Sequence, residues 1–218
     1  MSAREAILAR IRTAQGRSGS EPTEPELALV RETIERRAPG PQPSIARPPD
    51  LLAHFLAECG RVGTTHAVVE HLGQAPGETA RYLDANGLGR RIVAWEELAA
   101  LDWAGAGVGM EARAAGDADA VGVTGCFCAI AETGTLLLLG GAAMPKTTAL
   151  LPETHVAIVR RERLVATMED AFALLRSEAG EPPRSTWFVS GPSRTADIEQ
   201  TIVIGAHGPY RVHVIVAG

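Results

Sequence analysis

The stretch that decides the fold is VGVTGCFCAIAETGTLLLLGG, Val121–Gly141. It contains two short apolar runs bounded by glycines, a pattern typical of strands that are buried on both faces. One carboxylate, Glu132, stands just before the four leucines. A carboxylate beside a buried strand must accept hydrogen bonds or have its pKa raised. Glu132 is therefore either a structural tie, bonded to the amides of the turn or to Thr124, or a poised acid or nucleophile.

On both sides of this stretch, helical and strand-like segments alternate along the chain. The pattern predicts helices at DLLAHFLAEC (50–59), ETARYLDANG (78–87) and MEDAFALLRS (168–177), the last with a cap formed by Thr167 and Asp170. It predicts strands at 65–72 in part, 90–95, 118–125, 135–141, 155–161, 186–191 and 210–218. Strands that alternate with helices indicate an α/β protein whose mostly parallel sheet has helices on both faces.

The first 50 residues have a different composition. Ser2 and Glu5 have the spacing of a capping box, and the apolar residues that follow predict a helix over 3–14. Residues 16–50 are rich in Pro, Gly, Ser and Glu, with room for one short amphipathic helix. We therefore divide the chain into an N-terminal helix and arm, 1–50, and a domain, 51–218.

The overall composition excludes several classes of protein. The chain has 218 residues, of which 45% are hydrophobic and 22% charged, and its net charge is -5. These values are ordinary for a soluble globular protein and give no basic footprint for nucleic acid. No apolar run is long enough to span a membrane, and the arginine-rich start does not resemble a secretory signal, so a cytoplasmic location is expected. The three cysteines, Cys59, Cys126 and Cys128, are too few for a cluster or a disulfide framework, and no metal site is predicted.

Three loops have the form expected beyond strand ends: VGVTG with CFCAIAETGT, FVSGPSRTADIEQ, and VIGAHGPY. Open α/β sheets bind ligands beyond the carboxyl ends of their strands, so we expect the three loops to form one pocket. In the second loop, Ser193 or Thr195 is predicted to cap a helix whose amides, with Arg194, hold a carboxylate or phosphate. The alternative is a capped helix in which Arg194 pairs with Asp197.

Other residues give weaker signals. His207, between small residues, is either a general acid or base or a turn histidine bonded to the backbone. The glycines at 105, 107 and 109 precede a helix-like MEARAAG (110–116), but the spacing does not fit a dinucleotide fingerprint. The candidate catalytic residues are thus Glu132 and His207. The candidate ligand-binding residues are Thr124, Gly125, Thr133, Gly134, Ser190, Ser193, Arg194, Thr195, Asp197 and Gly208.

Four blocks in order, GVTGCFCAIAETGTLLL, ALLPETHVAIV, SGPSRTADIEQ and GAHGPYRVHVIV, resemble the signature blocks of the lactate utilization protein C family, whose members consist of one LUD domain. The resemblance covers residues 119–216. It implies a Rossmann-like fold similar to the NagB, ribose-5-phosphate isomerase and CoA-transferase group. It also implies a role in the oxidation of L-lactate to pyruvate, in a complex whose two companion proteins carry the iron–sulfur clusters, with no cofactor in this chain.

The same fold group suggests an alternative function. Class I CoA-transferases use the glutamate of an E-N-G sequence as a nucleophile, and Glu132-Thr133-Gly134 is similar, with Thr in place of Asn. A shared fold does not carry function with it. The leading hypothesis is a subunit without its own cluster that binds a small anion or a partner at the strand-end loops. The alternatives are a stand-alone acyl-transfer enzyme and a non-catalytic carboxylate sensor.

Overall fold

The computed structural model describes residues 2–17, 21–36, 38, 40, 47–181, 183–196 and 200–218. The chain divides into two compact units, Met1–Ala46 and Arg47–Gly218. No helix in these described ranges is long and apolar enough to cross a membrane.

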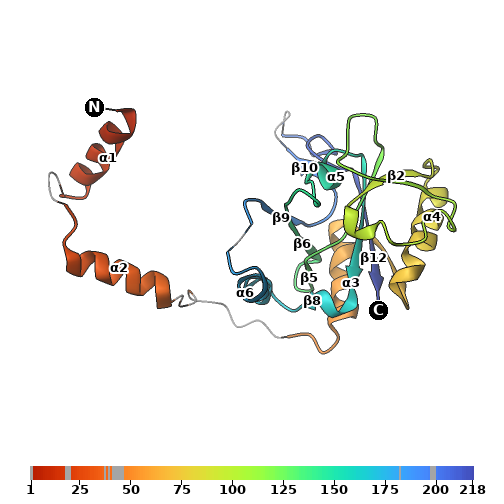
Figure 1. The fold of residues 1–218 in the computed structure, drawn as a ribbon, viewed down its shortest axis with the longest axis horizontal. Coiled ribbons are helices and arrows are strands. Elements are labelled where there is room, and N and C mark those ends of the chain that lie inside the picture. The colour runs from red at the N-terminus through yellow and green to blue at the C-terminus, as the bar shows by residue number, and fades with distance from the viewer. Residues whose placement is uncertain are drawn as a thin grey trace. The chain divides into compact units, whose positions relative to one another are not determined.

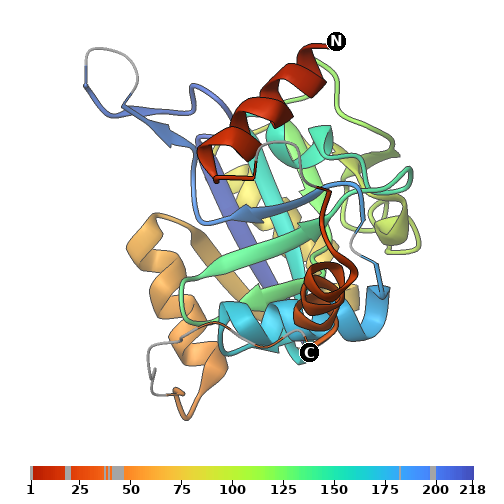
Figure 2. The ribbon, with the colours of Figure 1, turned by 90° about the vertical axis from the view of Figure 1, so that its left-hand side faces the viewer.

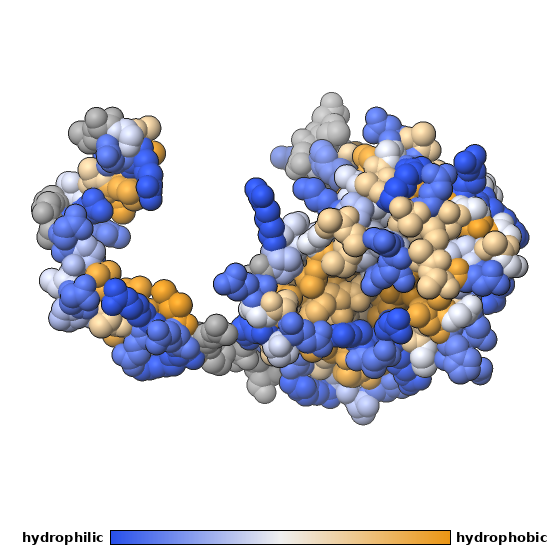
Figure 3. All heavy atoms as spheres, in the orientation of Figure 1, coloured by the Kyte–Doolittle hydropathy of each residue, from blue (hydrophilic) through white to orange (hydrophobic). Residues whose placement is uncertain are grey.

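The described residues of the first unit form two helices, α1 (Ala3–Ala14) and α2 (Glu24–Arg36). The predicted capping box is present, since the Ser2 hydroxyl accepts from the Glu5 amide and the Glu5 carboxylate accepts from the Ser2 amide. Neither helix buries a residue, and Figure 3 shows apolar side chains on the surface of both. They include Ile11 of α1 and Ile34 of α2, which are exposed.

The centre of the second unit is a six-stranded sheet. Its strands, in spatial order, are β1 (Thr65–Val69), β12 (Arg211–Ala217), β7 (Thr154–Arg160), β4 (Val121–Thr124), β2 (Arg91–Ala94) and β3 (Gly109–Ala112). Every neighbouring pair is parallel. The predicted parallel sheet is confirmed, and its central strands are buried because both faces are covered.

Alternate residues of β7 serve two different cores. Val156 and Ile158 pack with α4 (Ala75–Ala85), whereas Ala157 and Val159 pack on the opposite side with α3 (Leu51–Val62). Figure 1 shows α4 and α3 on opposite sides of the central strands. The predicted placement of helices on both faces is therefore confirmed. It follows from the two-residue period of a strand, which points successive side chains to opposite faces.

A second sheet covers the α3 face. Its strands, in spatial order, are β8 (Leu164–Val165), β5 (Cys128–Ile130), β6 (Thr135–Leu139) and β9 (Thr186–Val189). Figure 2 shows these strands running across those of the main sheet. Leu136 faces the core shared with α3, and Leu137 faces α6 (Met168–Ala179), which packs on the outer side. The run of leucines is thus a strand buried between two layers, antiparallel to both of its neighbours.

Two predictions of local structure were wrong. MEARAAG was expected to be helical, but Gly109–Ala112 is the edge strand β3, because it pairs with β2. A helix capped by Ser193 was expected to begin at Arg194, but β10 (Arg194–Thr195) pairs antiparallel with β11 (Val203–Ile204), and the helix expected if Thr195 is the cap falls on residues 197–199, outside the described residues. Backbone pairing, which a single sequence does not reveal, outweighed the local capping signal. Asp197 lies outside the described residues.

Short elements complete the unit. They are η1 (Leu72–Gln74), η2 (Glu96–Leu98), α5 (Thr147–Leu150) and η3 (Arg161–Arg163). Of these, η1, η2 and η3 follow β1, β2 and β7 at the carboxyl edge of the sheet. They supply the walls of the site described next.

Candidate functional site

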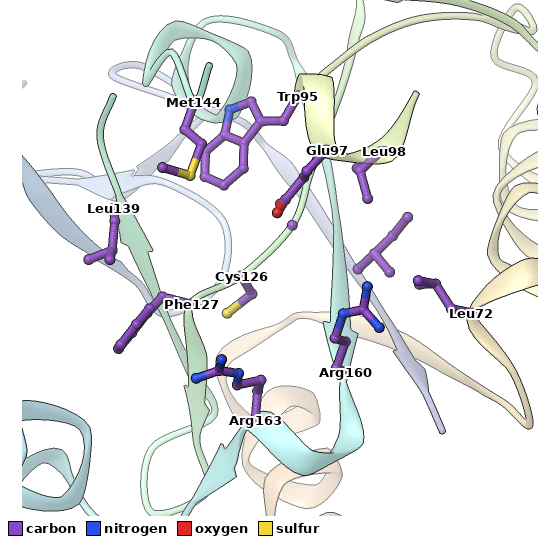
Figure 4. A pocket seen from close by; sticks show the side chains of 12 residues that line it. Leu72, Trp95, Glu97, Leu98, Cys126, Phe127, Leu139, Met144, Arg160 and Arg163 are labelled. Carbon is purple, nitrogen blue, oxygen red and sulfur yellow. The ribbon is translucent and has the colours of Figure 1, made fainter. Parts of the chain in front are cut away.

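A cavity of about 290 Å³ lies where parallel strands end. Its walls come from the segments after β1, β2, β4 and β7, so it occupies the place where open α/β sheets bind ligands. Figure 4 shows the lining side chains. The lining residues are Leu72, Trp95, Glu97, Leu98, Gly125, Cys126, Phe127, Leu139, Met144, Ile158, Arg160 and Arg163.

Glu97 is the acidic residue of the cavity. It lies in η2, one turn after β2, and its carboxylate points into the cavity (Figure 4). Its side chain is open to solvent on the cavity side, but the surrounding walls remove enough water to raise the pKa of Glu97, an effect that the charge of Arg160 partly offsets. A Cβ atom at Gly125 would overlap a carboxylate oxygen of Glu97. The absence of a side chain at Gly125 therefore makes room for the Glu97 carboxylate.

Two arginines form the opposite wall. Arg160 is the last residue of β7, and its guanidinium points toward the cavity (Figure 4). Among the described residues it has no ion-pair partner. Arg163, in η3, lies over the Phe127 ring at 5.6 Å and pairs with Glu178 at 2.8 Å. The charge of Arg163 is thus balanced by a carboxylate of the protein, whereas that of Arg160 is available to a ligand.

The remaining walls are apolar or neutral. The Trp95 indole is buried and donates to the Pro145 carbonyl at 3.1 Å, which fixes the ring. The Cys126 thiol donates to the Cys128 carbonyl, and burial raises the pKa of Cys126 well above its ordinary value. A thiol held neutral in this way is a poor nucleophile and a poor metal ligand.

Thr124, the last residue of β4, does not offer its hydroxyl to a ligand. The residue is fully buried, and its hydroxyl bonds Nε2 of His155 on the neighbouring strand β7 at 2.8 Å. Burial lowers the pKa of His155 to about 4, so the ring is neutral at ordinary pH. This hydrogen bond links β4 to β7 at the residue before Gly125. Of the predicted ligand-binding residues, Gly125 lines the cavity.

Glu132, Thr133 and Gly134 form the turn between β5 and β6. Hydroxyl–hydroxyl hydrogen bonds link Thr133 to Thr135 at 2.7 Å and Thr135 to Ser190 at 2.6 Å. Gly134 has φ +63° and lies against the backbone of α3, where a Cβ would come within 2.6 Å of the Cys59 nitrogen. This turn is packed against α3 and is absent from the lining of the cavity.

Glu132 itself is half-buried, and its amide donates to the Ala166 carbonyl at 3.0 Å. Within the described ranges, its carboxylate accepts none of the expected hydrogen bonds from Thr124 or from the amides of the turn. The prediction that Thr124 or the amides of the turn donate hydrogen bonds to the Glu132 carboxylate is therefore wrong. The turn is held by its hydroxyls and by Gly134.

The other predicted site residues lie at the opposite edge of the main sheet. The Ser193 amide donates to the Pro209 carbonyl at 2.8 Å. Pro209 lies two residues before the start of β12. Arg194 donates to the Val62 carbonyl at the end of α3, at 3.1 Å. His207 is exposed in the turn before β12, and Gly208 adjoins Ser193. Together with Thr195 of β10, these residues form a second group, and the expected single pocket is wrong because the loops are divided between two edges of the sheet.

Sequence reasoning did not identify Glu97, Arg160 or Trp95. The signal was present, because Trp95 is the last residue of the predicted strand RRIVAW, Glu97 follows that strand, and Arg160 is the next-to-last residue of the predicted strand HVAIVRR. Charged residues just beyond the carboxyl ends of parallel strands are candidates under the same rule that was applied to other loops. In the part of the chain that the structure describes, no group of three or more His, Cys, Asp or Glu side chains is placed to hold a metal ion.

Comparisons with known proteins agree with the fold. A crystal structure of a DUF162 family protein from Deinococcus radiodurans matches with a TM-score of 0.57 and 26% identity, over 77% of this chain and 96% of that one. Lactate utilization protein C 1 of Bacillus mycoides is 39% identical over 44% of this chain and 42% of its own length. Lactate utilization protein C of Deinococcus radiodurans is 41% identical over 46% of this chain and 47% of its own.

The matched stretch thus spans less than half the length of either curated relative. The family model of the LUD domain matches residues 96–217, which is more than half of the chain and includes Glu97, Gly125, Arg160 and Arg163. The resemblance noted from the four sequence blocks is confirmed, and the protein belongs to the LUD domain family.

Proposed function

We propose that this protein takes part in lactate utilization, as a cytoplasmic subunit without its own iron–sulfur cluster in a complex that oxidises L-lactate to pyruvate, and that its cavity binds a small carboxylate. The names of the relatives support the role in lactate utilization. Since the matched stretch is less than half of those proteins, the substrate and the partners are part of the proposal.

The observation that carries the proposal is the Arg160 guanidinium, which faces the cavity and has no ion-pair partner among the described residues. An arginine in such a position is suited to bind a carboxylate through paired, charge-assisted hydrogen bonds. The cavity of about 290 Å³ corresponds to about ten water volumes. It has room for a small organic acid together with a few waters, and its apolar walls suit the carbon chain of the ligand.

The cysteine chemistry supports placing the clusters in partner proteins. Cys59 and Cys128 are fully buried, and burial raises the pKa of each thiol to about 12. Iron–sulfur clusters need thiolates, about four of them, at one site. The electrons from lactate would therefore pass to companion proteins, and this chain would contribute binding and orientation.

Growth on L-lactate tests the proposal. A strain lacking the gene should not grow on L-lactate as sole carbon source, and the wild-type gene should restore growth. Arg160→Met should fail to restore it, whereas Arg161→Met removes an exposed arginine at the next position, outside the cavity lining, and should succeed. Tagged wild-type protein should co-purify with iron–sulfur proteins in cells grown on lactate. Normal growth of the deletion strain, or equal growth with both variants, would contradict the proposal.

The acyl-transfer and sensor alternatives remain predictions. In the acyl-transfer alternative, Glu132 would be the nucleophile, but the turn that holds it is not part of the cavity lining. No observation on the fold favours either alternative over the proposed role.

A further inference from the structure

We infer that the cavity binds its carboxylate together with one proton, which resides on Glu97 and bridges to the 2-oxygen of a 2-hydroxy or 2-oxo acid held by Arg160. This inference rests on the proposed carboxylate site. It adds the class of ligand, an identified proton acceptor and a dependence on pH.

The geometry brings the two charged groups to the same space from opposite walls. Glu97 comes from η2 after β2, Arg160 comes from the end of β7, and both point into the cavity (Figure 4). Gly125, directly after β4, which lies between β2 and β7 in the sheet, leaves room for the Glu97 carboxylate. A ligand whose carboxylate is held by Arg160 can therefore present the oxygen on its neighbouring carbon, C2, to the Glu97 carboxyl group.

The charge balance explains the need for a proton. Without ligand, the cavity holds one negative charge on Glu97 and one unpaired positive charge on Arg160, because Glu178 balances Arg163. A bound carboxylate adds a second negative charge to a site whose walls partly remove Glu97 from water, and like charges repel more strongly there than in bulk water. One proton from solution, bound to a carboxylate oxygen of Glu97, restores neutrality. No bond of the ligand is broken.

The other ionisable groups around the cavity do not compete for this proton. Cys126 remains a neutral thiol, because burial raises the pKa of its Sγ. Arg160 and Arg163 remain charged. His155, behind Thr124, remains neutral down to about pH 4. Glu97 is the lining carboxyl group whose pKa burial already raises in the absence of ligand. The proton taken up on binding is therefore assigned to Glu97.

A protonated Glu97 also selects the ligand. As a neutral carboxylic acid it donates one hydrogen bond, which a 2-oxo or 2-hydroxy oxygen accepts. Pyruvate and L-lactate have such an oxygen next to the carboxylate, and propionate does not. One neutral hydrogen bond is worth about 1 kcal/mol, so propionate should bind about fivefold more weakly than pyruvate.

Isothermal titration calorimetry of the whole chain tests the inference, with pyruvate, L-lactate and propionate from about pH 5 to about pH 8. Comparing buffers of different ionisation enthalpy gives the number of protons taken up. For wild type, we expect close to one proton per pyruvate at the upper end of this range. The affinity should then fall about tenfold for each unit of pH above the pKa of Glu97. Below that pKa the affinity should no longer change with pH, because Glu97 of the free protein already carries the proton.

Variants identify the acceptor. Glu97→Gln mimics the protonated form, so it should bind pyruvate with no proton uptake and little dependence on pH. Glu96→Gln removes the neighbouring carboxylate of η2, which does not line the cavity, and should behave as wild type. If Glu97→Gln does not fold, Gly125→Ala serves instead, because the new methyl group displaces the Glu97 carboxylate and should reduce the proton uptake.

The results separate this inference from the proposed function. If pyruvate binds wild type with an affinity independent of pH, or if Glu97→Gln keeps the proton uptake, the inference is wrong and the carboxylate site stands. If none of the three acids binds, the carboxylate site and the inference both fail, while the growth experiment still tests the role in lactate utilization.

Discussion

Two regions of the molecule place polar groups beside buried strands: the cavity at the carboxyl ends of the main strands, and the turn between β5 and β6. The two regions differ in the partners that these polar groups find. In the turn, the hydroxyls of Thr133, Thr135 and Ser190 bond one another, and Gly134 fits against α3. In the cavity, Glu97 and Arg160 face each other across open space, with no ion pair between them.

The difference indicates what each region is for. Buried polar groups that bond one another stabilise the fold and leave no capacity for a ligand. Charged groups held in a cavity without direct partners are a cost to the folded protein that a ligand can offset, and such groups are typical of functional sites. Changes in the turn should therefore reduce stability, and changes in the cavity should reduce binding.

Among single substitutions tested at neutral pH, the largest effect on stability is expected for Gly134→Ala. The residue has φ +63°, and its new Cβ would lie 2.6 Å from the Cys59 nitrogen, which is backbone and cannot move aside without shifting α3. Left-handed strain and overpacking together should lower the free energy of unfolding by about 3 kcal/mol. Urea denaturation measures this. As a control, Gly60→Ala within α3 adds a Cβ in open space and should stabilise the protein by about 0.5–1 kcal/mol.

The next effect concerns acid. Burial lowers the pKa of both His155 and His213 to about 4, below the ordinary value of 6.5. Between these values the unfolded chain binds more protons than the folded one, so stability is complete above about pH 6.5 and is lost as the pH falls toward about 4. The slope should reach about 1.4 kcal/mol per pH unit for each histidine. His155→Gln should reduce the slope measured by denaturation at several pH values, and an unchanged slope would mean that the histidine is not protonated on unfolding.

A smaller effect is expected for Thr135→Val, which preserves shape but removes the hydroxyl between Thr133 and Ser190. The loss of these hydrogen bonds at a buried site should cost about 1 kcal/mol of unfolding free energy, with carboxylate affinity unchanged. Thr186→Val, at an exposed position of β9, is the matched control and should change stability by less than about 0.5 kcal/mol. Weaker pyruvate binding by Thr135→Val would remove the distinction between the two regions.

The smallest effect is expected for Glu132→Gln. Because the carboxylate is half-exposed and bonds none of the predicted partners among the described residues, stability should change by less than about 0.5 kcal/mol, and pyruvate affinity should not change. Thermal denaturation and calorimetry measure both. Loss of growth on L-lactate with unchanged stability, or labelling of Glu132 by hydroxylamine in the presence of an acyl-CoA, would favour the acyl-transfer alternative.

Sequence reasoning was most successful where local patterns act alone. The caps of α1 and α6, formed by Ser2 with Glu5 and by Thr167 with Asp170, are present as predicted. The prediction for Ser193 was wrong although the capping pattern there was similar, because pairing between β10 and β11 engages that backbone instead. A local signal is reliable when no distant segment competes for the same amides.

The sequence by itself determined the class of fold, the family and the buried strands, because apolar runs, caps and ordered sequence blocks are properties of neighbouring residues. Only the tertiary structure decided which loops share a site. Strands that are adjacent in space, such as β4 and β7, are distant in sequence, and the edge at which a loop emerges depends on the direction of each strand in the sheet. For that reason Glu97 and Arg160, 63 positions apart in the chain, face the same cavity, while Glu132 and His207 lie elsewhere.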